Sequence, residues 1–201
     1  LVIADAVLTK GSVYKELLAH YKKDLAACEA IEAIWYALEH LRDLGSLVRV
    51  EEEVEAAVRK IKAKEDQNSP LLSSLKDWEQ YKSILLLRLK EALAAESKSH
   101  DINERIFGME GVKGLGLLEL LSRKYDVVCT NPPYMGSKNM GLVLKEFVAR
   151  YYAPGKRDLY AAFILRCREL AQEDGHVAMV TQQSWMFLRS FADLRAMTED
   201  R

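Results

Sequence analysis

Residues 125 to 134 of this 201-residue chain read Tyr-Asp-Val-Val-Cys-Thr-Asn-Pro-Pro-Tyr, and this stretch decides the fold. The apolar run from Val127 to Cys129 predicts a strand that is buried on both faces, as in a parallel sheet. Pro132 has no backbone N–H, so the hydrogen-bonded ladder of that strand must end just before it. Residues 131–134 therefore lie at the carboxyl edge of the predicted sheet, where open α/β sheets bind ligands.

The loop from Asn131 to Tyr134 carries groups that suit a planar amino compound. An amino group on a heteroaromatic ring or an amide is a poor nucleophile, so an enzyme that alkylates it must hold both of its hydrogens. The Asn131 side-chain carbonyl can accept one, and the adjoining Pro132 carbonyl can accept the other. The two acceptors would be preorganised, and the Tyr134 ring offers a face on which a base can stack. A strand-ending proline turn without chemistry is the alternative.

This loop resembles the catalytic loop of S-adenosylmethionine-dependent amino-methyltransferases, above all the N6-adenine DNA methyltransferases. Three further stretches resemble the large adenine-specific methyltransferases of BREX-type phage defence, which are cousins of fused restriction-modification enzymes. These stretches are Tyr134 to Met140, Lys156 to Phe163 and Gly175 to Phe187. The similarity covers about residues 101 to 198.

The resemblance implies an α/β fold, in which part of a Rossmann-like methyltransferase sheet follows a mainly helical region. It implies Asn131, Pro132, Pro133 and Tyr134 as catalytic residues, S-adenosylmethionine as cofactor, and double-stranded DNA with a flipped adenine as substrate. Leu159 and Phe163 would lie near the adenine of the cofactor, although either would serve equally in a core. Related loops also methylate a protein glutamine or the N2 amine of guanine in RNA, and these remain alternatives.

The sequence departs from that family because no glycine-rich cofactor turn precedes the loop. Val2 to Ala6 is strand-like but lacks the glycines, and Gly114 to Gly116 lies too close to the loop to be that turn. The chain also opens on Leu1 rather than Met. We therefore expect an internal fragment that is inactive alone, acts with other parts of a longer enzyme, and self-associates through exposed sheet edges. A helical interaction piece without activity is the alternative.

The pattern of apolar residues changes near residue 100, which predicts a helical region over 1–100 and a partial catalytic domain over 101–201. In the first region apolar residues recur at three- and four-residue steps, as in amphipathic helices, and Gly45 is expected to end one of them. Asn68 to Pro70 reads as a linker before a further helix. The recurring residues are Leu17, Tyr21, Leu25, Cys28, Ile31, Trp35, Leu38 and Leu41.

The second region predicts strand, helices and strand, and so a parallel pair. Helices are expected over 115–123, 141–152 and 157–172, a turn at Asp174-Gly175, and a second buried strand over 176–181. Asp158 is expected to cap the helix that follows it, with phosphate contact by Lys156 to Asp158 as the alternative. Trp185 and Met186 either stack near the site or pack under the sheet.

Composition narrows the class of protein further. The net charge is −1, with 15 basic against 17 acidic residues in the first hundred and 14 against 13 in the rest, so neither half is a strongly basic nucleic-acid binder. Cys28, Cys129 and Cys167 lie far apart without metal-ligand spacing, so we expect no metal site and a cytoplasmic location. The longest apolar run, Leu159 to Leu165, is too short to cross a membrane.

Overall fold

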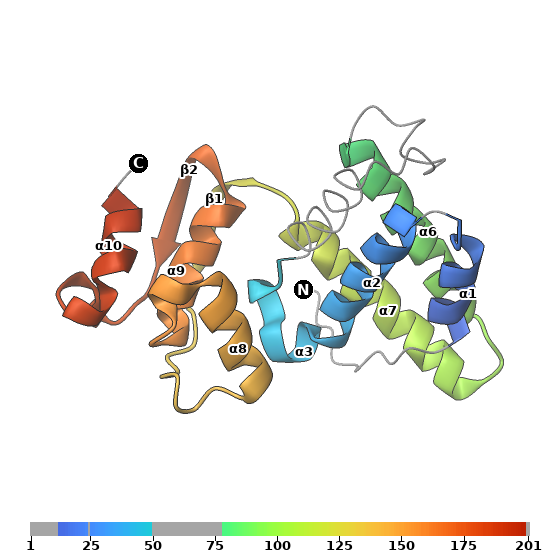
Figure 1. Cartoon of the computed structure of the whole chain (residues 1–201), viewed down its shortest axis with the longest axis horizontal. Coiled ribbons are helices and arrows are strands. Elements are labelled where there is room, and N and C mark those ends of the chain that lie inside the picture. The colour runs from blue at the N-terminus through green and yellow to red at the C-terminus, as the bar shows by residue number, and fades with distance from the viewer. Residues whose placement is uncertain (1–11, 24, 50–77, 200–201) are drawn as a thin grey trace. The chain divides into compact units, whose positions relative to one another are not determined.

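The computed structural model describes residues 12–23, 25–49 and 78–199, which fall into two compact units (Figure 1). One unit takes the described residues up to Arg42 together with those from Val48 to Ser122. The other takes Asp43 to Leu47 and the residues from Arg123 onward. The domain division at residue 100 stays a prediction, and the predicted linker at residues 68–70 lies outside the described residues.

Helices form the first unit. Trp35 is fully buried at its centre, with its ring 5.1 Å from that of Tyr14 and 6.0 Å from that of Phe107. The predicted amphipathic pattern is confirmed as separate helices, and α3 ends where Gly45 adopts a φ of 52°. The helices are α1 (Ser12–His20), α2 (Leu25–Glu39), the start of α3 (Leu41–Leu44), α6 (Trp78–Glu96) and α7 (Ile102–Leu121).

Glycines allow α7 to lie very close to its neighbours. A Cβ on Gly108 would stand 2.3 Å from the Ser97 nitrogen, and one on Gly111 would stand 2.8 Å from the Leu93 side chain. A Cβ on Gly114 would stand 2.8 Å from the side chain of Leu38 in α2. The three glycines recur at every third residue, so they share the face of α7 that meets α6 and α2.

The predicted helix over 115–123 is wrong at its start, because α7 begins at Ile102 and ends at Leu121. Asp101 caps α7, because its Oδ1 accepts hydrogen bonds from the backbone of Asn103 at 2.7 Å and of Glu104 at 3.2 Å. Glycine disfavours an isolated helix, and here close packing outweighs that preference. None of the described helices is both long and apolar enough to span a membrane.

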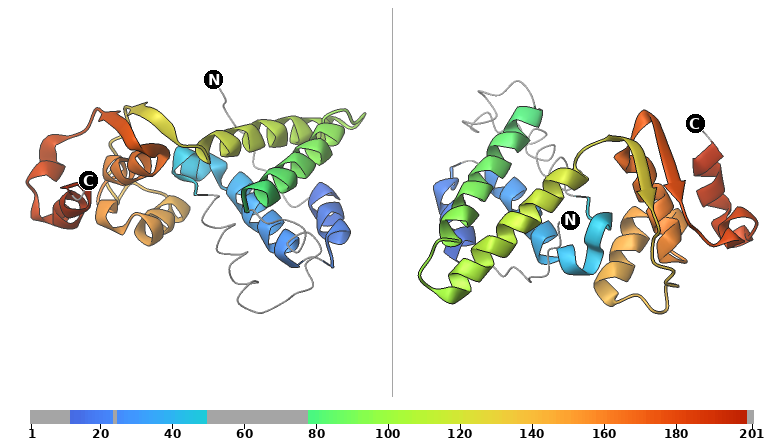
Figure 2. Two further views of the ribbon diagram at one scale, coloured as in Figure 1. Left: turned by 90° about the horizontal axis from the view of Figure 1, so that it is seen from above. Right: turned by 180° about the vertical axis from the view of Figure 1, so that it is seen from behind.

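The second unit pairs strands β1 (Tyr125–Thr130) and β2 (Ala171–Met179) in parallel. Helix α9 (Leu159–Leu170) leads directly into β2 and packs against both strands (Figure 2). This confirms the predicted parallel pair, and the described chain as a whole is rich in helix. The remaining elements are η1 (Gly45–Leu47), α8 (Leu142–Tyr151), η2 (Ala153–Gly155), η3 (Gln183–Met186), η4 (Arg189–Phe191) and α10 (Ala192–Glu199).

The pairing of β1 with β2 is irregular at its start. Tyr125 pairs with Ala171, but the next pair joins Val127 to His176, so the register skips four residues of β2. Asp174 and Gly175, predicted as a turn, lie in this skipped part. A Cβ on Gly175 would stand 2.8 Å from the Tyr125 carbonyl oxygen, which explains the need for glycine there. Strand β2 therefore begins five residues before the predicted strand.

The prediction that both strands are buried on both faces is wrong. Val127 in β1 is 58% exposed and Cys129 is exposed, as are their partners His176 and Ala178 in β2. A strand of a parallel sheet is buried on both sides only where helices cover both faces. Within the described residues α9 packs against the sheet, and the face that carries Val127 and Cys129 is left open.

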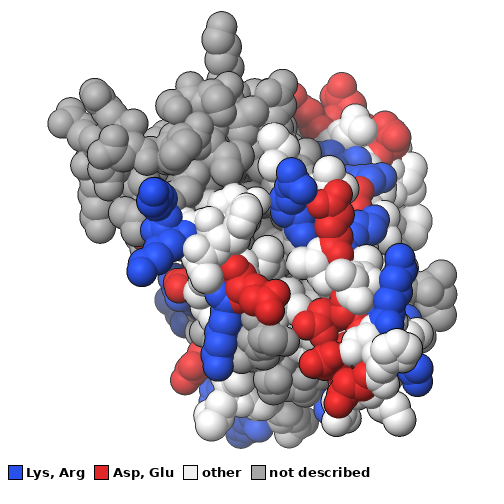
Figure 3. All heavy atoms as spheres, turned by 90° about the vertical axis from the view of Figure 1, so that its right-hand side faces the viewer, with Lys and Arg blue, Asp and Glu red and all other residues white. Residues whose placement is uncertain are grey.

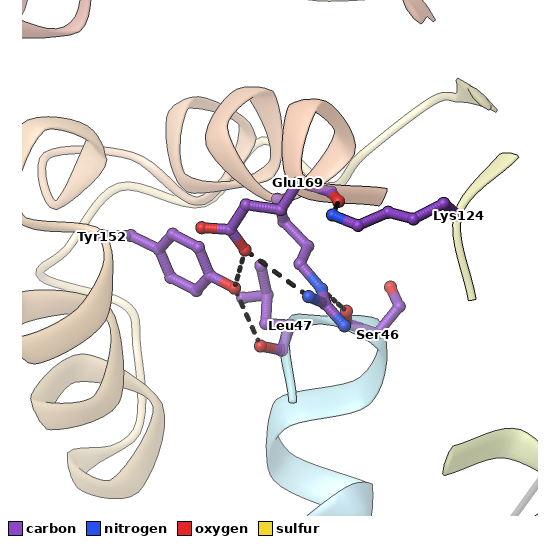
Figure 4. A network of polar contacts seen from close by, with 6 residues as sticks. Ser46, Leu47, Lys124, Tyr152 and Glu169 are labelled. Atoms are coloured by element: carbon purple, nitrogen blue, oxygen red, sulfur yellow. Dashed lines mark hydrogen bonds and ion pairs between the residues drawn. The ribbon is translucent and has the colours of Figure 1, made fainter. Parts of the chain in front are cut away.

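A short segment from the first half of the sequence belongs to the second unit. Asp43 to Leu47 is anchored there by two buried side chains that bond to its carbonyls (Figure 4). The Arg166 Nε donates to the Ser46 oxygen at 3.0 Å, and the Tyr152 hydroxyl donates to the Leu47 oxygen at 3.1 Å. Arg166 is 4% exposed and Tyr152 fully buried, so both need such acceptors.

Glu169 links the two anchors. Its Oε2 lies 3.4 Å from the Arg166 Nη1 and 3.4 Å from the Tyr152 hydroxyl, while its backbone oxygen accepts from the Lys124 Nζ (Figure 4). The end of α9, the start of β1 and the 43–47 segment thus form one polar network.

Candidate active site

The predicted loop follows β1 at the carboxyl edge of the sheet. Strand β1 ends at Thr130, and its carbonyl accepts a hydrogen bond from the Val180 nitrogen, just past β2, at 3.2 Å. The ladder stops before Pro132, as its missing N–H predicts. The segments that follow β1 and β2 therefore leave the sheet at the same edge.

Tyr134 is fixed at one end and open to solvent over much of its ring. Its hydroxyl donates to the Val180 carbonyl at 3.1 Å, and 46% of the residue is exposed. The ring meets that of Tyr160 edge to face, with centroids 6.0 Å apart and an interplanar angle of 86°. An aromatic ring that is both oriented and accessible is the arrangement that base stacking requires.

The residues before Tyr134 divide between the surface and the interior. Asn131 and Pro133 are exposed, whereas Pro132 is buried. Within the described part of the chain no hydrogen bond engages the Asn131 side chain, so its carbonyl can accept from a ligand. The structure thus brings Asn131 to Tyr134 together at the sheet edge, and their catalytic role stays a prediction.

Asp158 joins this loop to helix α9. One oxygen, Oδ1, accepts from the Met135 nitrogen at 3.1 Å and from the Tyr160 nitrogen at 3.4 Å. The bond to Tyr160 confirms that Asp158 caps α9. The Leu159 nitrogen in turn donates to the Met135 carbonyl at 2.9 Å. The loop and the helix are therefore joined through both the N–H and the C=O of Met135.

Tyr160 connects the site to the segment after β2. It is 1% exposed, and its hydroxyl lies 2.9 Å from the Ser184 Oγ. Burial raises the pKa of the Tyr160 phenol; the Ser184 hydrogen bond opposes this rise, and the Asp158 carboxylate adds to it. The phenol therefore stays protonated near neutral pH and serves as a hydrogen-bonding group.

The segment after β2 is held by polar contacts and exposes apolar side chains. The Trp185 Nε1 donates to the Thr181 Oγ1 at 3.1 Å, and the Arg195 Nη1 donates to the carbonyls of Trp185 and Leu188, each at 2.8 Å. Trp185 is half-buried while Met186 is 59% exposed, so the two residues differ in surroundings.

Ser184 and Arg195 were not singled out from the sequence. Ser184 contacts Tyr160, which lies 24 residues before it, and Arg195 bonds to backbone oxygens. Contacts of these two kinds produce no recognisable sequence pattern. The two residues predicted beside the cofactor also differ, because Leu159 is only 5% exposed and Phe163 is half-buried. That contact stays a prediction.

Three basic residues lie in the two segments that pair just after the loop. Ser137 donates its backbone N–H to the Arg157 carbonyl at 3.0 Å, which pairs the segment that carries Lys138 with the segment that carries Lys156 and Arg157. All three cations are exposed, and no ion pair involves them within the described residues. By contrast, the face of the molecule drawn in Figure 3 mixes basic and acidic side chains without a large area of one sign.

Comparisons with known proteins find similarity over nearly the whole chain. The model of the family "Eco57I restriction-modification methylase" matches residues 9–200. "Adenine-specific methyltransferase BrxX" of Escherichia coli O9:H4 (strain HS) is 34% identical over 159 residues, or 79% of this chain and 11% of that protein. "Adenine-specific methyltransferase PglX" of Lacticaseibacillus casei (strain Zhang) is 51% identical over 75 residues, or 37% of this chain and 6% of that protein. The chain thus matches only a small part of the length of either relative.

Proposed function

This chain belongs to the Eco57I restriction-modification methylase family, and from that premise we propose that the protein carrying it methylates the N6 amino group of adenine in DNA. The reaction would serve phage defence or restriction-modification, in keeping with the adenine-specific relatives. The two strands and α9 are compatible with a methyltransferase fold, and we propose that they are part of a larger Rossmann-like sheet.

One observation carries this proposal. The Asn131 to Tyr134 loop lies at the carboxyl edge of a parallel sheet; it carries the Asn131 amide, which makes no hydrogen bond to the described residues, and the Tyr134 ring, whose hydroxyl donates to the Val180 carbonyl. Ligands bind at this edge in open α/β folds. The combination of two carbonyl acceptors and an exposed aromatic face suits a planar base with an amino group.

The proposed mechanism assigns a role to each group of the loop. The Asn131 side-chain carbonyl and the Pro132 backbone carbonyl accept the two amino hydrogens and stabilise the nitrogen as it becomes tetrahedral. Tyr134 stacks on the adenine after the base leaves the duplex. The methylated nitrogen then loses a proton to water or a nearby acceptor, so no deprotonated side chain is needed. Positioning supplies most of the rate enhancement.

S-adenosylmethionine would supply the methyl group as an electrophile. Of the two residues proposed beside its adenine, half-buried Phe163 offers ring surface, whereas Leu159 is 5% exposed and belongs to the core. The sequence has no glycine-rich turn to hold the methionine part. We therefore propose that this chain contributes the target-base side of the site, and that other segments of the protein hold most of the cofactor.

DNA is the proposed partner of the exposed cations beside the loop. Lys138, Lys156 and Arg157 have no carboxylate partner among the described residues, and phosphates attract such groups. Over the chain as a whole acidic and basic residues nearly balance, so other parts of the protein would provide most phosphate contacts. We propose a cytoplasmic location, where such DNA is found.

A methyl-transfer assay tests the proposal. The protein that carries this sequence is incubated with radiolabelled S-adenosylmethionine and, in parallel, with a DNA duplex, with RNA and with a protein extract, and the labelled products are digested to nucleosides or amino acids. We expect label in N6-methyl-2′-deoxyadenosine. Label in a protein glutamine or in RNA guanine would replace the proposed substrate, and no transfer to any of the three would favour an inactive interaction piece.

A further inference from the structure

We infer that Asp158 is a positioning residue for the methyl-transfer loop: its carboxylate fixes the loop against α9 and so sets the place of Tyr134 and its neighbours. The inference rests on the proposed function for its effect on rate. The contact itself is observed, because the backbone nitrogens of Met135 and Tyr160 both donate to the Asp158 Oδ1.

The composition of the loop explains why it needs an outside anchor. Pro132 and Pro133 have no backbone N–H, so neither can donate a hydrogen bond that holds the loop to the sheet. Within the described residues, anchoring comes from the Tyr134 hydroxyl, which donates to the Val180 carbonyl, and from the two flanks of the loop. On one flank the Thr130 carbonyl accepts from Val180, and on the other the Met135 nitrogen donates to Asp158.

The second flank is held twice. Met135 donates its N–H to the Asp158 carboxylate at 3.1 Å and accepts from the Leu159 N–H at 2.9 Å. The Leu159 bond and the bond from the Ser137 N–H to the Arg157 carbonyl together form the isolated antiparallel bridge between Gly136 and Asp158. Tyr134 immediately precedes Met135, so the backbone position of the stacking residue depends on this contact. Among the described residues, Asp158 supplies the one side chain that bonds to the Met135 backbone.

This contact is expected to affect the rate of methyl transfer, because the loop is proposed to act by positioning the amino group. If the loop accelerates transfer by orienting the amino group, a displacement of about 1 Å can cost roughly a hundredfold in rate. Asp158 Oδ1 bonds to the Met135 and Tyr160 nitrogens, and so it would act through Met135 and Tyr134.

Three substitutions separate the positioning role from the capping role. Asp158→Asn keeps an acceptor oxygen in the same place, so it retains both bonds. Asp158→Ser keeps a favoured N-cap for the Tyr160 N–H, but its hydroxyl is one bond shorter and gives up the Met135 N–H. Asp158→Ala loses both.

The experiment measures each variant within the protein that carries this sequence. Single-turnover methylation gives the rate, KM for DNA and cofactor gives binding, and hydrogen exchange gives protection of the Met135 and Tyr160 amides. We expect Asp158→Asn to stay within about threefold of wild type. Asp158→Ser should keep Tyr160 protected, lose protection at Met135 and slow transfer by roughly tenfold to a hundredfold at unchanged KM.

Two results would overturn the inference. Full activity of Asp158→Ser would reduce Asp158 to a helix cap, and an Asp158→Asn variant as slow as Asp158→Ala would point to its charge instead. Failure of the proposed function looks different, because the wild-type protein would then transfer no methyl group to adenine. The loss of Met135 protection in Asp158→Ser would still be observed.

Discussion

The ring of Tyr134 stands edge to face with that of Tyr160, and one residue of this pair is exposed while the other is buried. Tyr160 is further tied to Ser184 by its hydroxyl, and Tyr134 is tied to the Val180 carbonyl. The proposed stacking residue is thus supported by a packed ring from α9 and by the segment after β2. This support makes the roles of the loop residues separable by mutation.

Replacing Asn131 by Ala should abolish most methyl transfer with little change in cofactor affinity. The substitution removes one of two acceptors that act as the amino nitrogen becomes tetrahedral. We expect a loss of about 10²–10³ in rate or more, as for a lost oxyanion-type donor. Single-turnover methylation measures the rate, and calorimetry with the cofactor measures its affinity. Near-wild-type turnover would contradict the proposed role of Asn131.

Tyr134→Ala should weaken binding of DNA that carries an extruded adenine by roughly 5- to 150-fold, since base stacking contributes about 1–3 kcal/mol. Tyr134→Phe keeps the ring face and loses only the bond to the Val180 carbonyl, which is worth about 0.5–1.5 kcal/mol. Titration with a duplex that contains a mismatched adenine measures the DNA affinity of both variants. If Phe were as damaging as Ala, the hydroxyl would matter more than the ring.

Lys156→Gln and Arg157→Gln should each lower the salt dependence of DNA binding. A cation that neutralises one phosphate contributes a slope of about 0.9 in the plot of log affinity against log salt concentration. Lys113→Gln is the control, because Lys113 already pairs with Glu110 at 2.8 Å in the other unit. Equal slopes for all three variants would show that Lys156 and Arg157 do not meet phosphate.

Two glycines on the same helix should respond oppositely to Ala. Gly108→Ala places a Cβ 2.3 Å from the Ser97 backbone and should loosen the packing of α6 on α7 at a cost of about 1–3 kcal/mol. Gly116→Ala meets nothing within 4 Å and should be neutral or stabilise α7 by up to about 1 kcal/mol. Hydrogen exchange in α6 and α7 distinguishes them, and similar exchange in both variants would contradict the close approach.

The two cysteines of the second unit should differ sharply toward iodoacetamide at pH 8. Burial raises the pKa of the Cys167 thiol to about 11, so only about one molecule in a thousand carries the reactive thiolate. Cys129 is exposed on the open sheet face. We expect peptide mapping of the isolated 201-residue chain to find Cys129 alkylated first. Equal labelling of Cys167 under native conditions would contradict its burial.

Local signals in the sequence were sufficient to place the loop. The missing N–H of Pro132 fixes where β1 ends, and the strand, helix and strand order fixes the parallel pairing. Asp158 before an apolar run predicts a helix cap, which the structure confirms. Each of these predictions depends on groups within a few residues of one another.

The predictions that failed depend on distant neighbours. Val127 looks like a core residue, yet its burial depends on whether a second layer covers the sheet. The helix predicted from residue 115 in fact begins at Ile102 and includes Gly108, a residue type that disfavours helices. Glycine is needed at this position because the Ser97 backbone lies against it. The hydrogen bond from Met135 to Asp158 also escaped prediction, since Met135 lies 23 residues before Asp158.

The 43–47 segment makes the second unit discontinuous along the chain, which limits how the protein can be divided. A protease cut or gene truncation that removes residues 1–122 would also remove the Ser46 and Leu47 carbonyls to which buried Arg166 and Tyr152 bond. Loss of each acceptor costs about 1–3 kcal/mol. A split version of this chain should therefore keep residues 43–47 with the second unit, or recover them from a peptide supplied in trans.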